Sequence, residues 1–166
     1  MALSQAHFQR LVTDHGPSLY RMAYRMVGHA HEAEDIVQDT YRSAWKSRKS
    51  FREGYSERAW LATILRRRTV DRWRTKPQPT TLAETDGVDV PAPHEDPFAD
   101  QYTDEMQTAL NQLSPDLRDC LLMVVVGELT HQETADTLSI PLGTVLSRVS
   151  RARKQLRKAL LAVAQH

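Results

Sequence analysis

The 166-residue sequence contains a single cysteine, Cys120. One cysteine excludes both an internal disulfide and a zinc site built from several cysteines. Because Cys120 is followed by Leu121 and Leu122, the sequence favours a buried structural thiol over a redox-sensing one. The seven histidines do not cluster at metal-ligand spacings either: His29 and His31 are followed by no second ligand pair. We therefore expect no metal and no cofactor.

Long apolar runs are also missing, and no stretch approaches the roughly 18 residues of a membrane-spanning helix. The N-terminus lacks the layout of a signal peptide. There is no glycine-rich phosphate loop, no nucleophile elbow and no other catalytic set of side chains, so the sequence does not indicate an enzyme. We expect a cytoplasmic protein without membrane insertion, made of one domain or two small ones.

Charge is abundant, and it is divided along the chain. Residues 1–74 hold 14 Lys and Arg against 8 Asp and Glu, a net charge of +6. Residues 75–105 hold 1 against 8, a net charge of −7, and residues 106–166 hold 7 against 5, a net charge of +2. Basic segments attract phosphate and acidic segments are repelled by it. The two flanking segments therefore indicate an anionic partner such as a nucleic acid.

Helical spacing of apolar residues covers most of residues 1–75, which we predict to be an all-α domain. Gly16-Pro17 is expected to separate the first two helices, because proline is disfavoured inside a helix, and Gly28 is expected to end the second. The four predicted helices cover about residues 5–14, 17–27, 31–46 and 57–74.

The third predicted helix carries an acidic, polar face, because Asp35, Gln38 and Asp39 fall at i, i+3 and i+4. Two carboxylates at this spacing could in principle hold a magnesium ion. No third carboxylate is placed to help, so a surface that contacts another protein is the simpler interpretation.

The segment 47–55 is predicted to be a basic loop with two aromatic residues. Its cations can lie on phosphates while its rings stack on bases, as in single-strand binding. The alternative, left open by the segment alone, is a solvated loop whose rings pack against the core. The following helix carries six arginines, more than solubility requires, which favours an anionic partner. The candidates are Arg48, Lys49, Phe51, Arg52 and Tyr55 in the loop and Arg66, Arg67 and Arg68 in the helix.

Periodicity disappears between about residues 75 and 100, which hold five of the eight prolines and few large apolar residues. Such a segment buries too little apolar surface to fold. We therefore predict a flexible acidic linker over residues 76–102, which joins two small helical domains at residues 1–75 and 103–166.

The second domain is predicted to begin with a helix from about residue 103 and another from Pro115. A short strand is not excluded at Met123–Val126, where β-branched residues run together. Helix caps on both sides of this run favour a helix.

The end of the chain has the pattern of a helix-turn-helix, from Thr130 to Lys158. Thr130 and Glu133 form a capping box that starts a helix, and Pro141 belongs to the turn that interrupts it. A basic helix follows, with Val145 and further apolar residues on one stripe. In a helix-turn-helix this second helix enters the DNA major groove. For the basic helix alone, the alternative is an amphipathic helix with a solvated face.

In this order, the motifs resemble those of the bacterial extracytoplasmic-function (ECF, group IV) RNA polymerase sigma factors of the minimal two-domain type. The similar stretches are EAEDIVQDTYRSAW, AWLATILRRRTVDRWR and IPLGTVLSRVSRAR, and the match covers about residues 6–74 and 105–160. The resemblance implies two helical domains and a promoter-specificity subunit. Such a subunit binds core polymerase, recognises the −35 and −10 promoter elements and helps to open the DNA.

The resemblance also implies roles for individual residues. Asp35, Gln38 and Asp39 would bind the clamp helices of the polymerase β′ subunit, and the loop and arginines named above would bind the −10 element. The second domain would contact the β flap. The acidic linker would run toward the RNA exit path, and a separate anti-sigma protein would regulate the chain. The residues that would read the −35 element are Thr144, Leu146, Ser147, Arg148, Ser150 and Arg151.

Several positions depart from the family pattern. Leu146 stands where Lys or Arg is common, Arg67 where Asn is common and Ser139 where a turn glycine is frequent, and the loop at 47–55 is short. These departures bear on which promoter sequences are preferred. A stand-alone helix-turn-helix regulator would explain residues 106–166 equally well, but it gives the acidic face and the aromatic loop no role. A nucleic-acid enzyme would need a catalytic set that the sequence lacks.

Overall fold

The computed structural model of the chain describes residues 3–74 and 104–164, called here the N-terminal half and the C-terminal half. The described residues form helices joined by short loops and contain no strand, which confirms the predicted all-α fold class. The predicted linker at 76–102 lies outside them. The helices are α1 (Gln5–Val27), α2 (Ala30–Lys46), the short 3₁₀ helix η1 (Arg48–Ser50), α3 (Glu57–Arg74), α4 (Asp104–Gln112), α5 (Pro115–Val125), α6 (His131–Leu138) and α7 (Leu142–Ala164).

The predicted break at Gly16-Pro17 is wrong, because α1 runs through both residues. A Cβ added at Gly16 would lie 2.9 Å from the hydroxyl of Tyr41, a buried residue of α2. Gly16 therefore serves the close approach of two helices rather than a turn. Pro17 forgoes one helical hydrogen bond, but buried apolar residues on both sides, such as Leu11 and Leu19, hold the helix continuous.

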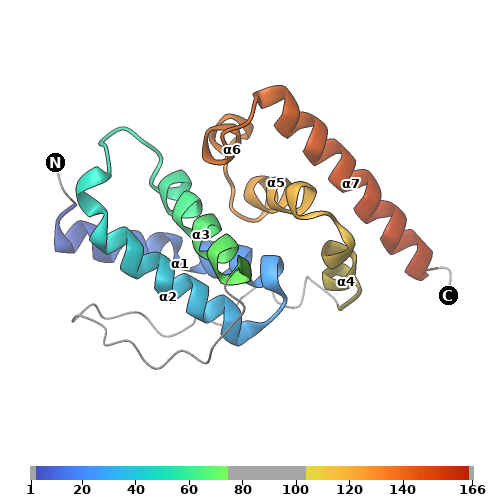
Figure 1. Cartoon of the computed structure of the whole chain (residues 1–166), viewed down its shortest axis with the longest axis horizontal. Coiled ribbons are helices and arrows are strands. Elements are labelled where there is room, and N and C mark those ends of the chain that lie inside the picture. The colour runs from blue at the N-terminus through green and yellow to red at the C-terminus, as the bar shows by residue number, and fades with distance from the viewer. Residues whose placement is uncertain (1–2, 75–103, 165–166) are drawn as a thin grey trace.

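The N-terminal half is a bundle of α1, α2 and α3, seen together in blue to green in Figure 1. Gly28 ends α1 as predicted: its φ is +75°, and its N–H donates to the Tyr24 carbonyl at 2.7 Å. Ser56 begins α3, since its hydroxyl accepts from the Ala59 N–H at 3.1 Å.

The C-terminal half contains the predicted helix-turn-helix as α6 and α7. The capping box is confirmed, because the Glu133 N–H donates to Thr130 Oγ1 at 3.0 Å and the Thr130 N–H donates to Glu133 Oε1 at 2.9 Å. The apolar stripe of α7 faces inward, with Val145 and Val149 buried. The strand that the sequence left open near Met123 does not form, because α5 continues to Val125.

The turn between α6 and α7 places Ser139 in the left-handed region, with φ +55° and ψ +45°. The Ile140 N–H donates to the Ala135 carbonyl at 3.0 Å and the Ser139 N–H to the Asp136 carbonyl at 3.3 Å. These two bonds form a Schellman motif, in which glycine is the favoured left-handed residue. Ser139 therefore carries backbone strain that glycine would avoid.

Replacing Ser139 by glycine is expected to raise the free energy of unfolding by about 0.5–1 kcal/mol, because only the glycine adopts this φ without a Cβ penalty. Urea unfolding followed by circular dichroism measures the change. Ser139→Ala is the matched control: it keeps the Cβ and should give no gain. A Ser139→Gly protein no more stable than the wild type would contradict the assignment of strain to this turn.

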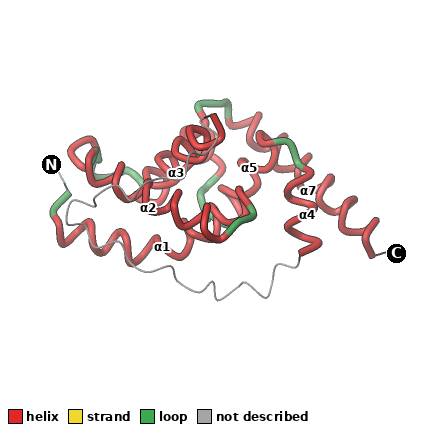
Figure 2. The backbone as a smooth tube through the Cα atoms, turned by 60° about the horizontal axis from the view of Figure 1, so that its bottom comes forward, coloured by secondary structure: helices red, strands yellow, loops and turns green. Residues whose placement is uncertain are grey.

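The two halves pack directly against each other (Figures 1 and 2), and their buried apolar residues form one continuous core. Met22 of α1 and Leu129 meet at this boundary around Gly127. A Cβ added at Gly127 would lie 3.1 Å from Met22 Sδ and 3.3 Å from Leu129 Cδ1. The absence of a side chain at Gly127 thus allows the halves to approach closely.

Candidate nucleic-acid interface

The predicted polymerase-binding residues lie on the outer face of α2 and are partly exposed. The Asp39 side chain is 45% exposed and accepts from Arg42 Nη1 of the same helix at 3.1 Å. The Asp35 side chain is 49% exposed and pairs with Arg72 Nη2 of α3 at 3.1 Å. Gln38, which lies between these two residues in the sequence, is half-buried. The two carboxylates therefore lie on one accessible face of α2, as the helical spacing predicted. Asp35 also links α2 to α3 through Arg72.

The two aromatic residues of the basic loop differ in burial. Phe51 is only 5% exposed, and its ring meets that of Trp60 edge to face at a centroid distance of 5.1 Å. Tyr55 is 65% exposed. Phe51 therefore packs on the core, as the alternative interpretation of this segment expected, while Tyr55 offers an exposed ring.

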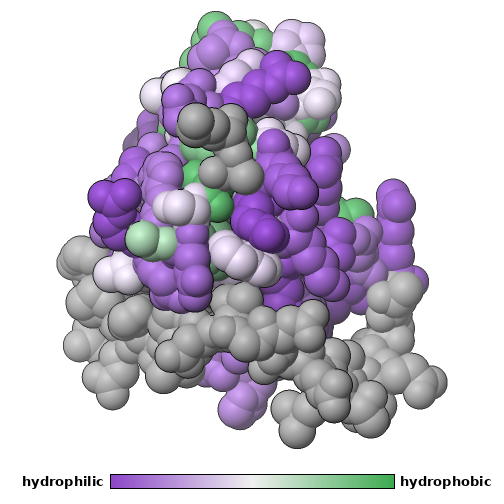
Figure 3. Space-filling model, turned by 90° about the vertical axis from the view of Figure 1, so that its left-hand side faces the viewer, coloured by the Kyte–Doolittle hydropathy of each residue, from purple (hydrophilic) through white to green (hydrophobic). Residues whose placement is uncertain are grey.

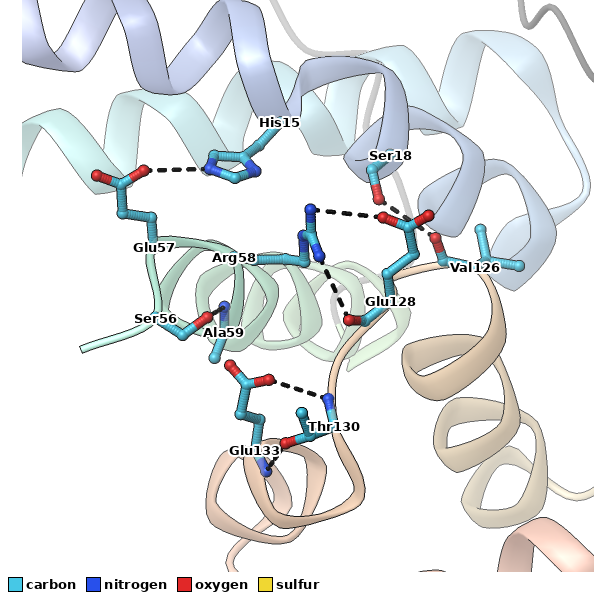
Figure 4. Close-up of polar contacts among 10 residues, drawn as sticks. All are labelled: His15, Ser18, Ser56, Glu57, Arg58, Ala59, Val126, Glu128, Thr130 and Glu133. Atoms are coloured by element: carbon cyan, nitrogen blue, oxygen red, sulfur yellow. Dashed lines mark hydrogen bonds and ion pairs between the residues drawn. The ribbon is translucent and has the colours of Figure 1, made fainter. Parts of the chain in front are cut away.

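Three residues that sequence reasoning did not single out join α1 to the start of α3, which follows this loop: His7, His15 and Glu57. The Glu57 carboxylate accepts hydrogen bonds from two histidines, with His7 Nε2 at 2.7 Å from Oε1 and His15 Nε2 at 3.2 Å from Oε2. The second contact is drawn in Figure 4. Burial acts to raise the pKa of the Glu57 carboxyl, but the hydrogen bonds from His7 and His15 outweigh it and hold that pKa below its usual range. These contacts tie the start of α3 to α1.

The Lys and Arg residues predicted to bind the −10 element differ in their contacts with the rest of the chain. Arg48 lies over the Trp45 ring at 4.1 Å, and Arg68 pairs with Asp71 at 3.2 Å. Lys49, Arg52 and Arg67 are exposed. Arg66 instead points to the C-terminal half, where its Nε lies 3.6 Å from Asp119 Oδ2.

The predicted −35 residues lie on α7, on the side opposite to its buried stripe. Leu146 is 50% exposed, and Arg151 Nη2 donates to Ser147 Oγ at 2.9 Å. Ser150 is exposed as well, and Thr144 is half-buried. Arg148 is the exception, because its side chain is only 26% exposed and lies 4.0 Å from Asp116 of α5.

Figure 3 shows one face of the molecule coloured by hydropathy. Viewed from the N-terminal side, the described surface is largely hydrophilic, with apolar side chains confined to small areas (Figure 3). Among residues 3–74 and 104–164, no helix is long and apolar enough to cross a membrane, and no group of three or more metal-ligating side chains is gathered.

Family comparison identifies both halves. Residues 11–77 match the family described as sigma-70 region 2, and residues 103–156 match sigma-70, region 4. The first match contains the acidic face of α2 and the arginines of α3. The second contains the helix-turn-helix.

Whole-chain relatives agree with these matches. The chain is 35% identical over 160 residues to the ECF RNA polymerase sigma factor SigE of Mycolicibacterium smegmatis, covering 92% of this chain and 61% of that relative. It is 30% identical over 168 residues to the ECF RNA polymerase sigma factor SigW of Bacillus subtilis, covering 94% of this chain and 90% of that relative.

Solved structures show the same fold. The sigma factor RpoE, solved with the anti-sigma factor NepR from Bartonella quintana, is 29% identical, with a TM-score of 0.73 over 92% of this chain and 96% of that one. CnrH, solved with the cytosolic domain of CnrY, is 24% identical, with a TM-score of 0.74 over 96% and 90%.

Proposed function

The chain belongs to the ECF RNA polymerase sigma factors, and from this premise we propose how its residues divide the work of promoter recognition. As a sigma factor, it is the specificity subunit of RNA polymerase and not an enzyme. In the proposal, the N-terminal half binds core polymerase and the −10 element, and the C-terminal half reads the −35 element. The observation that carries this division is the presence of an acidic face and two basic faces on separate helices of one chain.

The polymerase contact is assigned to Asp35, Gln38 and Asp39 on α2. The carboxylates of Asp35 and Asp39 are about half exposed, so a basic partner can reach them without unfolding the helix. The partner proposed from the family resemblance is the coiled coil of the β′ clamp helices. Complementary charge of this kind steers association and fixes the register of the complex.

The −10 contact is assigned to the loop before α3 and to the arginines of α3. Tyr55 supplies an exposed ring for stacking on an unpaired base, and Lys49, Arg52 and Arg67 supply exposed cations for the backbone. Phe51 supports them from the core side through Trp60. Together these groups stabilise the separated strand and so help to open the duplex.

The −35 contact is assigned to the exposed side of α7 in the major groove. Its members are Thr144, Leu146, Ser147, Arg148, Ser150 and Arg151. Leu146, half exposed on this surface, offers an apolar contact to a thymine methyl group rather than a hydrogen bond.

Replacing Arg151 by alanine is expected to cost about 1–3 kcal/mol of discrimination at one base pair of the −35 element, because Arg reads a base edge through two hydrogen bonds. Competition binding of the holoenzyme to single-substituted promoters measures it. Lys158→Ala is the control: it alters an exposed cation further along α7 and should change all affinities alike. An equal loss on every sequence with Arg151→Ala would instead assign Arg151 to a phosphate.

Two further partners follow from the family. The structure of RpoE with the anti-sigma factor NepR supports an anti-sigma protein as the regulator of this chain. The β flap is the proposed polymerase contact of the C-terminal half. Because polymerase and promoter DNA are its proposed working partners, we propose that the chain acts in the cytoplasm.

Selection of genomic DNA fragments tests the proposed division. Core polymerase with the chain should retain fragments that core polymerase alone does not, and these fragments should share two separated sequence blocks. Retention of the same fragments by the chain without polymerase, with one shared block, would favour a stand-alone helix-turn-helix regulator instead.

A further inference from the structure

A cavity of about 380 Å³ lies where the loop before α3 and the first turns of α3 meet α6. Its aromatic lining comes from Phe51 and Trp60, whose rings pack edge to face, and from the exposed Tyr55. Thr63 of α3 and Thr137 of α6 also line the cavity, and their hydroxyl oxygens lie 3.4 Å apart. The volume falls within the range of about 300–1,000 Å³ that is usual for sites of small molecules.

The lining that comes from α6 is acidic. Glu133 and Asp136 both line the cavity, and their spacing of three places them on one face of the helix. Glu133 Oε1 accepts from the Thr130 N–H at 2.9 Å, and Asp136 Oδ1 accepts from Gln132 Nε2 at 3.0 Å. The ion pairs formed within residues 3–74 and 104–164 include neither of these two carboxylates. The cavity therefore offers two acidic groups that lack a paired cation in the described parts of the chain.

The Glu133 carboxyl is held in its charged form. Burial acts to raise its pKa, but hydrogen bonds with Ser56 and Thr130 and the nearby charge of Arg58 outweigh burial and hold that pKa below its usual range. Figure 4 shows the Glu133 carboxylate beside Ser56 at the start of α3. Of the described residues that line the cavity, only Arg52 is a cation, and it is exposed. The cavity thus combines a net negative charge with aromatic rings.

This combination favours a small organic cation as the occupant. A protonated amine gains charge-assisted hydrogen bonds to carboxylates and is attracted to the faces of aromatic rings. A flat ring attached to that amine stacks on Trp60 and Tyr55. A nucleotide is disfavoured, because Glu133 and Asp136 repel its phosphate. The cavity therefore differs in chemistry from a site for an unpaired promoter base.

We propose that the cavity is a binding site for a small aromatic amine, with the ammonium group at Glu133 and Asp136 and the ring against Trp60 and Tyr55. Tyr55 also belongs to the proposed −10 contact, so a bound amine and an unpaired base compete for the same ring. This competition rests on the proposed function, whereas the binding of the amine does not.

Isothermal titration calorimetry of the full chain with tryptamine tests the site. Tryptophol and indole-3-acetate share the indole ring and carry a hydroxyl or a carboxylate in place of the amine. Tryptamine is expected to bind with a Kd below about 1 mM, tryptophol at least about fivefold more weakly, and indole-3-acetate not measurably. Equal binding of tryptamine and tryptophol, or no binding of tryptamine, would overturn the proposal.

Variants of the acidic lining test which groups hold the amine. Glu133→Gln keeps the start of α6, because glutamine also completes a capping box. Combined with Asp136→Asn, it should weaken tryptamine binding at least about tenfold and abolish the preference over tryptophol. Tyr55→Ala should weaken both compounds alike. Asp14→Asn, at an exposed position of α1, is the charge-matched control and should change nothing; wild-type affinity in the double variant would overturn the assignment of the ammonium group.

Permanganate reactivity of promoter thymines tests the competition. With the chain limiting, tryptamine at ten times its Kd should lower promoter opening about tenfold by mass action, and tryptophol at the same concentration should lower it less. Opening by the Glu133→Gln/Asp136→Asn variant should resist tryptamine. Opening that resists tryptamine in the wild type, although calorimetry shows binding, would overturn the competition. Absence of opening without any amine would instead count against the proposed function, and the calorimetric result would still decide the site.

Discussion

Asp39→Arg is expected to weaken binding of core polymerase by at least about 100-fold, because reversing a charge against a basic partner costs several kcal/mol. The Asp39 carboxylate is 45% exposed, and it pairs with Arg42 on the same helix. Its replacement therefore breaks no contact between helices. Fluorescence titration of labelled chain with purified core polymerase measures the affinity.

Asp35 requires a substitution that does not reverse its charge, because it pairs with Arg72 of α3 at 3.1 Å. An arginine at this position would repel Arg72 and loosen the bundle as well as the polymerase contact. Asp35→Asn removes the charge alone and should weaken polymerase binding less than Asp39→Arg does. Asp14→Arg, on the exposed side of α1, is the control and should bind normally. Wild-type affinity in Asp39→Arg would contradict the assignment of α2 to the polymerase.

Phe51→Ala is expected to lower the free energy of unfolding by about 3–5 kcal/mol, the usual cost of truncating a buried phenylalanine. The ring is 5% exposed and packs on Trp60, with the His7 ring at a centroid distance of 6.4 Å. Urea unfolding measures the loss. A change below about 0.5 kcal/mol, typical of surface positions, would mean that the ring is free to bind DNA instead.

Tyr55→Ala is the matched comparison, because this ring belongs to the same loop and is 65% exposed. Its removal should leave stability nearly unchanged and should weaken opening of the −10 element by about 1–3 kcal/mol, the value of one stacked base. Permanganate reactivity of promoter thymines reports the opening. Equal effects of both substitutions on stability would contradict the different placement of the two rings.

Local signals in the sequence predicted much of the fold. The capping box of Thr130 and Glu133, the terminating Gly28 and the apolar stripe through Val145 each depend on residues within a turn or two of one another. Whether these features form depends on the local backbone and on residues close in the sequence. The same is true of the acidic face of α2, which is a matter of helical spacing alone.

Features decided by tertiary packing could not be predicted in this way. Gly16-Pro17 has the composition of a break, yet the helix continues because apolar residues on both sides of it are buried. Gly16 instead leaves room for Tyr41 of α2. Phe51 and Tyr55 belong to the same short loop, and the packing of Phe51 on Trp60, which comes from another element, is what distinguishes the buried ring from the exposed one. The pairing of Arg66 with Asp119 joins residues that are distant in sequence, and no local pattern marks it.

Run-off transcription with purified bacterial core polymerase tests the central claim most directly. The templates are genomic fragments, including the region upstream of the gene that encodes this chain. The account predicts discrete start sites that require the chain, that share a −35 and a −10 element, and that are lost with Asp39→Arg but kept with Asp14→Arg. Transcripts that are the same with and without the chain, although the chain binds core polymerase, would contradict it.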